Sequence, residues 1–158
     1  MTMIAKKVLI IEDSQTQAQT LQKILESYGL RVLWAPGGRI GIQLAEQWIP
    51  DVVILDVKMP EMDGFEVCAC LRDNPKTEHI PVVMMTRYNE PDTLKMGIYL
   101  GAVDFIPKDE FANMVLVKTL EQLRVLQDDL VYPSAAPTPA LAPGADEADS
   151  AVAGDKPV

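Results

Sequence analysis

The sequence is poor in residue types that often define a site or a location. It has two cysteines and one histidine, and it has no apolar run long enough to span a bilayer. Cys68 and Cys70 lie two residues apart on a predicted helix, where side chains point to different sides, so they do not pair or chelate together. His79 has no partner at the spacing of a metal site or a catalytic dyad, so we expect it on the surface. These absences exclude a disulfide framework, a Cys/His metal centre and a transmembrane helix.

Basic residues are also scarce. Lys and Arg number 14 against 23 Asp and Glu, which gives a formal net charge of -9. Binding to nucleic acid or to an anionic membrane needs clustered cations, so both are disfavoured and protein partners or small ligands are favoured. The apolar run at residues 8–11 is too short for a signal peptide and ends in two acids. We expect a cytoplasmic protein.

The hydrophobic content is sufficient for one domain with a remainder. Residues of this kind make up 48% of the 158-residue chain. From Pro133 onward the composition changes to Ala, Pro, Gly and acids, with too few large apolar groups to offset the entropy of ordering. The sequence therefore predicts a domain over residues 1–131 and a disordered Ala/Pro-rich acidic tail over residues 132–158.

Short apolar runs alternate with amphipathic segments five times. The predicted strands are residues 7–11, 31–34, 52–55, 80–85 and 103–106. The predicted helices follow Ser14, Gly38, Gly64 and Pro91, and a last helix runs over residues 109–130. This alternation predicts an α/β fold, a doubly wound five-stranded parallel sheet of the flavodoxin-like order 2-1-3-4-5 with five helices.

Polar residues follow four of these strands directly. They are Glu12 and Asp13, Asp56, Thr86, and Lys108. Taken singly, each is more often a turn former, a helix cap or a solvated surface group. In a parallel sheet, however, all strands end at one edge, and the first and third strands are neighbours at the switch point where such folds bind ligands. We therefore expect these side chains to share one site.

The expected site has a definite chemistry. Three crowded carboxylates repel one another and require a cation, and a set of hard oxygen ligands favours Mg²⁺. Asp56 can then act as a nucleophile that forms an acyl phosphate. Lys108 and the Thr86 hydroxyl can each contact an oxygen of the transferred group.

The motif D-x-x-M-P-x-M-D-G at residues 56–64 resembles the phospho-acceptor loop of bacterial response-regulator receiver domains. The resemblance extends from residue 6 to about residue 127. It implies Asp56 as the phospho-acceptor and Lys108 as the phosphate contact. The remaining implied roles are Mg²⁺ ligation by Glu12, Asp13, Asp56 and the Lys58 backbone carbonyl, a switch hydroxyl on Thr86 and a switch aromatic at Phe105.

One part of the chain departs from the family pattern. Receivers usually follow the site lysine with proline, in a bond that is commonly cis, whereas here Pro107 precedes Lys108 and Asp109 follows it. A cis Lys108–Asp109 bond would cost about 3–4 kcal/mol, so we expect a trans bond. Asp109 is expected to be the N-cap of the last helix.

The resemblance implies a stand-alone response regulator of a two-component phosphorelay. Its partners would be a sensor histidine kinase or a histidine phosphotransfer protein, and a downstream protein that recognises a switched surface; no room is expected for an output domain. Its catalysis would be limited to its own phosphorylation and dephosphorylation. A phosphorylation-independent interaction module is the alternative. A magnesium-dependent phosphatase is disfavoured because Lys58 stands where that chemistry needs a second aspartate.

Two finer expectations concern lifetime and assembly. Lys58 and Tyr88, each two residues beyond a site residue, should flank the approach of water to the phosphoryl group and tune its lifetime. The last helix should expose Leu126, Leu130 and Val131, which predicts a homodimer or a docked partner through that helix.

Overall fold

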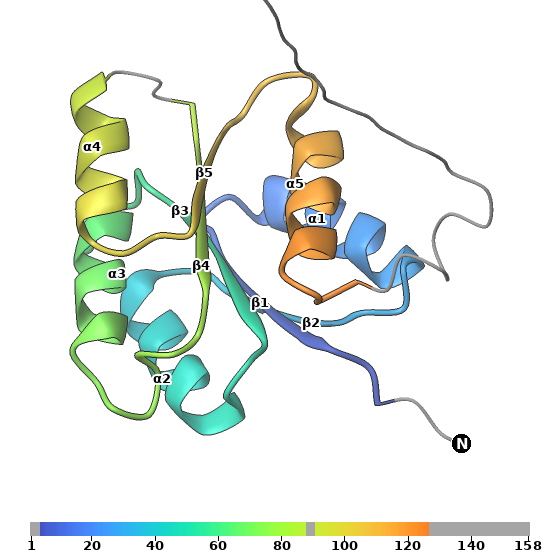
Figure 1. Ribbon diagram of the computed structural model, residues 1–158, viewed down its shortest axis with the longest axis horizontal. Helices are drawn as coiled ribbons and strands as arrows, with labels where there is room; N and C mark the ends of the chain where they lie inside the picture. The colour runs from blue at the N-terminus through green and yellow to red at the C-terminus, as the bar shows by residue number, and fades with distance from the viewer. Residues whose placement is uncertain (1–3, 88–90, 127–158) are drawn as a thin grey trace, which may run out of the picture. The chain divides into compact units, whose positions relative to one another are not determined.

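The computed structural model describes residues 4–87 and 91–126, which form a five-stranded sheet flanked by helices (Figure 1). The elements in order are β1 (Lys7–Ile11), α1 (Gln15–Ser27), β2 (Arg31–Ala35), α2 (Gly38–Trp48), β3 (Val52–Asp56), α3 (Gly64–Arg72), β4 (Val82–Thr86), α4 (Pro91–Tyr99), β5 (Asp104–Pro107) and α5 (Ala112–Gln122). The predicted alternation of strands and helices is confirmed. None of the helices in the described part is both long and apolar enough to cross a membrane.

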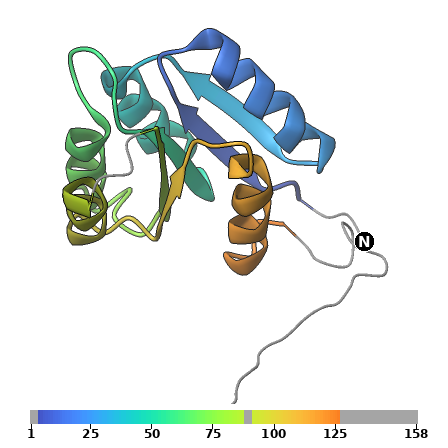
Figure 2. The same cartoon turned by 90° about the horizontal axis from the view of Figure 1, so that it is seen from above.

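All strand pairs are parallel, in the order β2-β1-β3-β4-β5, as predicted. Helices α1 and α5 cover one face of the sheet, and α2, α3 and α4 cover the other (Figures 1 and 2). Since both faces are covered, β3 and β4 are buried along their whole length and read as continuous apolar runs. The central pair β1 and β3 aligns Ile11 with Leu55, so Glu12 and Asp56 leave the sheet side by side.

Local capping fixes the two helices that follow this central pair. The Ser14 hydroxyl accepts from the Gln17 backbone N–H at 3.3 Å and caps α1, as its sequence predicted. Helix α3 begins with a capping box in which Asp63 and Glu66 each accept a backbone N–H of the other, at 2.9 and 3.0 Å. The Asp63–Gly64 end of the motif is therefore the start of a helix.

The start of the last helix differs from the prediction. Phe111 occupies the N-cap position of α5, and the Asp109 carboxylate accepts from the Phe111 backbone N–H at 2.9 Å. Asp109 thus closes a turn before the helix, and its predicted role as N-cap is wrong. The expected trans geometry of the Lys108–Asp109 bond is confirmed, since residues 4–87 and 91–126 contain no cis peptide bond.

The end of the last helix also differs. Helix α5 ends at Gln122, and Arg124 adopts a left-handed backbone with φ 65°. The backbone N–H groups of Val125 and Leu126 then both return to the Leu120 carbonyl. The predicted continuation of the last helix to residue 130 is wrong beyond Gln122 for the described residues, which reach Leu126. Leu126 is only 4% exposed, so it adds nothing to an exposed apolar surface. The predicted contributions of Leu130 and Val131 lie outside the described residues.

Gly64 allows the α3 start to lie directly against the end of β3. A Cβ at this position would lie 2.3 Å from the Asp56 carbonyl oxygen, a backbone atom that cannot rotate away. Gly64→Ala should therefore lower the free energy of unfolding by about 1–3 kcal/mol, despite the better helix propensity of alanine. Gly37→Ala is the comparison variant, because a Cβ there meets nothing within 4 Å and the change affects only the N-cap preference of α2. Equal urea midpoints for the two variants would contradict the close approach at Gly64.

Candidate functional site

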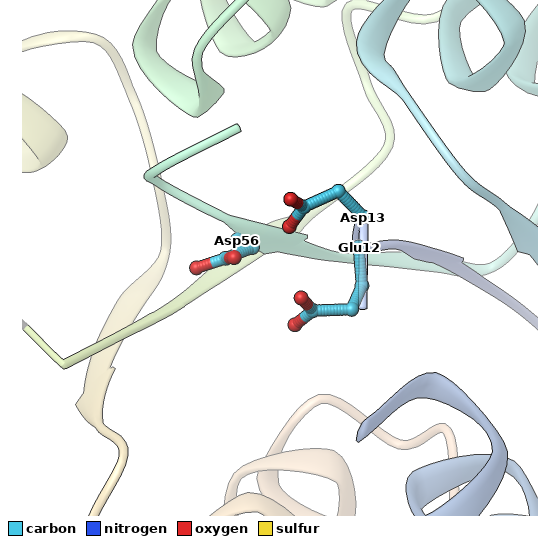
Figure 3. A group of neighbouring side chains, drawn as sticks. All are labelled: Glu12, Asp13 and Asp56. Carbon is cyan, nitrogen blue, oxygen red and sulfur yellow. The ribbon is translucent and has the colours of Figure 1, made fainter. Parts of the chain in front are cut away.

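Three carboxylates converge at the carboxyl edge of the central strands. Glu12 and Asp13 extend from the end of β1 toward Asp56 at the end of β3 (Figure 3). One carboxylate oxygen from each residue lies within 4.8 Å of the other two. The sequence prediction that these three side chains meet is confirmed by this geometry.

The backbone of Glu12 is held from the neighbouring strand. Its N–H donates to the Ala35 carbonyl at 3.1 Å, and its carbonyl accepts from the Trp34 indole N–H at 2.7 Å. Glu12 and Asp56 are 6% and 9% exposed, whereas Asp13 is exposed. Two of the three charges are therefore largely removed from water, which increases their mutual repulsion.

The Lys108 ammonium group lies among these charges. Its Nζ is 2.6 Å from Glu12 Oε1 and 3.4 Å from Asp56 Oδ1, and it donates to Gln17 Oε1 at 2.8 Å. The Lys108 backbone N–H donates to the Thr86 carbonyl at 2.7 Å, which continues the β4–β5 ladder one residue beyond the strand. Lys108 is thus fixed at both ends and offsets part of the carboxylate repulsion.

Burial raises the pKa of Asp56 from 3.8 to about 6. The Lys108 ammonium lowers this pKa, and the Glu12 carboxylate raises it again. The loss of hydration is the largest of these effects. The charged form of Asp56 is therefore costly without a further cation.

The carboxylates and Lys108 line a pocket of about 350 Å³. Its other lining residues are Ser14, Gln17, Lys58 and Arg87. Three convergent carboxylate oxygens, with no Cys or His in the described cluster, form a donor set that fits Mg²⁺. Since Asp13 is exposed, a cation could enter from solvent.

Of the other predicted site residues that the structure describes, only Lys58 lines the pocket. Thr86 ends β4 but is fully buried and does not line the pocket. Phe105 lies on β5, where its ring packs against α4; a Cβ on Gly97 would come 2.6 Å from its Cδ2 atom. Lys58 is exposed at the rim of the pocket, and Tyr88 lies outside the described residues. His79 is exposed, as expected, while Cys68 is buried and Cys70 exposed.

Gln17 and Arg87 line the pocket, although the sequence predicted no function for either. The spacing of Ser14 and Gln17 is that of a capping box, yet the Gln17 side chain accepts from Lys108 Nζ, and the Ser14 N–H donates to Glu12 Oε2 at 3.1 Å instead. Arg87 follows Thr86 and brings a third cationic side chain to the pocket, besides Lys58 and Lys108. Its position directly after a strand, like that of Lys108, is the pattern that could have identified it.

The sheet order and the carboxylate cluster with its lysine define an α/β domain of the receiver type. The family model for the response regulator receiver domain matches residues 8–121. The chain therefore belongs to the response regulator receiver domain family of two-component systems.

Known relatives agree with this assignment. The chain is 33% identical over 129 residues to the response regulator PleD of Caulobacter vibrioides, a match that covers 80% of this chain but 28% of that protein. It is 36% identical to the protein PilH of Pseudomonas aeruginosa, over 65% of this chain and 84% of that protein. Among solved structures, the chemotaxis protein CheY4 of Vibrio cholerae matches with a TM-score of 0.71 and 32% identity, over 76% of this chain and 99% of that one.

Asp56→Asn should stabilise the metal-free protein at neutral pH. Because the folded-state pKa is raised, stability that is fully present below about pH 4 is lost as the pH rises through about 6. Asparagine has no charge to desolvate, so the free energy of unfolding should increase by about 1–3 kcal/mol near pH 8, and the gain should shrink toward pH 4. Urea unfolding across this range measures the difference. The exposed variant Glu110→Gln is the control, and an Asp56→Asn gain that does not change with pH would contradict the assignment.

Proposed function

We propose that this chain is a response regulator that accepts a phosphoryl group on Asp56. The observation that carries the proposal is the placement of the Asp56 carboxylate, which lines the pocket together with two other carboxylates and the Lys108 ammonium. A buried nucleophile beside a fixed cation suits phosphoryl transfer, in which catalysis consists of positioning and electrostatic stabilisation.

The proposed phosphoryl transfer involves only groups of this site and of the phosphoryl donor. An Asp56 carboxylate oxygen attacks the phosphorus atom, an acyl phosphate bond forms, and the bond from phosphorus to the leaving group breaks with its electron pair. The Lys108 ammonium binds an oxygen of the transferred group, and Arg87 attracts the anionic donor to the pocket. When held by Glu12, Asp13, Asp56 and the Lys58 backbone carbonyl, Mg²⁺ would offset the added negative charge.

The same proposal assigns roles to the switch residues, to the residues that tune the phosphoryl lifetime and to the partners. Thr86 is the switch hydroxyl, and Phe105 is the aromatic side chain whose packing against α4 responds to it. Lys58 and Tyr88 tune the lifetime of the phosphoryl group. The phosphoryl donor is a sensor histidine kinase or a histidine phosphotransfer protein, and the response passes to a downstream protein.

The proposal also covers the domain organisation, the location and the assembly of the chain. Residues 1–131 act as a cytoplasmic receiver, and the tail predicted for residues 132–158 lies outside the described residues. Catalysis is confined to the chain's own phosphorylation and dephosphorylation. The homodimer expected through the last helix relied in part on an exposed Leu126. Leu126 is buried, so this residue does not contribute to such an interface.

Incubation with acetyl phosphate and Mg²⁺ tests the phospho-acceptor directly. The wild-type chain should gain one phosphoryl group by intact mass, and hydroxylamine should remove it. Asp56→Asn should gain none, whereas Glu61→Gln, an exposed acid in the same loop, should behave as wild type. Hydroxylamine-labile phosphate on Asp56→Asn would refute the assignment. A wild-type chain that takes no phosphate would favour the phosphorylation-independent module.

Mg²⁺ should stabilise the folded chain, because the unfolded chain lacks the cluster of carboxylates. At 100 times the dissociation constant the gain is about 2.7 kcal/mol, measured as an increase in the urea midpoint. Asp13→Asn should abolish most of this gain, while Asp109→Asn, an exposed acid held in a turn, should retain it. Equal gains in both variants at matched ionic strength would mean that the ion binds elsewhere.

A further inference from the structure

The Lys108 side chain is part of a closed ring of hydrogen bonds that includes the first turn of α1. Lys108 Nζ contacts Glu12 Oε1 at 2.6 Å, and Glu12 Oε2 accepts from the Ser14 N–H at 3.1 Å. The Ser14 hydroxyl accepts from the Gln17 N–H at 3.3 Å, and Gln17 Oε1 accepts from Lys108 Nζ at 2.8 Å. The ring joins the end of β1, the N-cap of α1 and the residue after β5.

Within this ring, the two short contacts of Lys108 are not with the proposed nucleophile. Its Nζ lies 2.6 Å from Glu12 and 2.8 Å from Gln17, but 3.4 Å from Asp56. An ammonium group has three N–H donors, so two are used by the ring and the third remains for the Asp56 side of the pocket. Asp56 is therefore paired with Lys108 only loosely.

Gln17 differs from the other acceptors of Lys108 because it is neutral. A carboxylate in its place would be a fourth negative charge in the cluster and would neutralise the lysine further. An amide carbonyl accepts the hydrogen bond and leaves the positive charge available. Gln17 thus fixes the position of Lys108 without competing for its charge.

Packing alone does not hold the ammonium group in place. A second pocket of about 380 Å³ lies between α1 and α5, and both Lys108 and Gln17 line it. Without the Gln17 carbonyl, Lys108 has space to move, and the nearest opposite charges are Glu12 and Asp56. A closer ion pair with Asp56 would make that carboxylate a weaker nucleophile.

We propose that Gln17 is a positioning residue that holds the Lys108 ammonium between Glu12 and Asp56, so that its charge serves the incoming phosphoryl group. The effect on transfer rests on the proposed function of Asp56. The effect of Gln17 on the position of the Lys108 ammonium group does not depend on that function. It can be measured in the unphosphorylated chain without metal.

The first experiment observes the Lys108 ammonium group by ¹H–¹⁵N NMR in the full-length, metal-free chain, with Lys108→Arg identifying the resonance. Two short acceptors slow proton exchange with water, so the wild type should show the resonance. Gln17→Met keeps the side-chain length and the helix propensity but removes the carbonyl, so the Lys108 resonance should disappear in this variant. Gln17→Glu restores an acceptor, so the resonance should return. Gln19→Met, an exposed position on the same helix, is the control and should retain it. An unchanged resonance in Gln17→Met overturns the proposal.

The second experiment measures phosphorylation by acetyl phosphate in the presence of Mg²⁺. Gln17→Met should lower the maximal rate by about tenfold to a hundredfold, the expected order for loss of one hydrogen bond to a charged group. The acetyl phosphate concentration at half-maximal rate should match that of Gln19→Met, because the proposal gives Gln17 no contact with the donor. A maximal rate equal to that of Gln19→Met overturns the proposal. If the wild type takes no phosphate, the proposed function fails, and the NMR comparison still decides the position of Lys108.

Discussion

The contact between the Lys108 ammonium and the carboxylates at the switch point is the interaction on which this site depends. Glu12, Asp13 and Asp56 lie within 4.8 Å of one another, and two of them are largely buried, so repulsion would otherwise drive them apart. Neighbouring strands lie about 4.8 Å apart, and β5 is two strands away from β3. Only a long side chain reaches that far, which explains why a lysine can serve the central strands from the end of the edge strand β5.

The rest of the fold keeps these charges from relaxing away from one another. Glu12 is fixed by the Trp34 indole and the Ala35 carbonyl, so it cannot withdraw without breaking two hydrogen bonds to the end of β2. Asp56 is fixed by the close approach of Gly64 and by the capping box that begins α3. The site is therefore held under electrostatic strain by the hydrogen bonds and packing around it, and a bound cation would relieve that strain.

Sequence reasoning succeeded where the topology determines the outcome. Residues that follow parallel strands must reach one edge, so the meeting of Glu12, Asp13, Asp56 and Lys108 could be predicted from strand order alone. The end of the last helix could not, because its apolar pattern continues and no Gly or Pro marks the left-handed residue Arg124. The contact of the Gln17 side chain with Lys108 could not be predicted for a related reason. Its backbone satisfies the capping pattern, and a neutral acceptor carries no charge that would mark its side chain.

The exchange of proline and aspartate around Lys108 is explained by the same contacts. Pro107 pairs with Thr86 at the end of β5, where a missing N–H costs nothing if the strand lies at the edge. Lys108 then supplies the N–H that bonds to the Thr86 carbonyl, which fixes the lysine backbone with a trans bond on either side. Asp109 is exposed, and its carboxylate accepts from the Phe111 N–H. Because that hydrogen bond holds it in the turn and water screens its charge, Asp109 competes little with Asp56 for the ammonium group. The family's usual order is thus replaced by a different backbone path that still delivers Lys108 to the carboxylates.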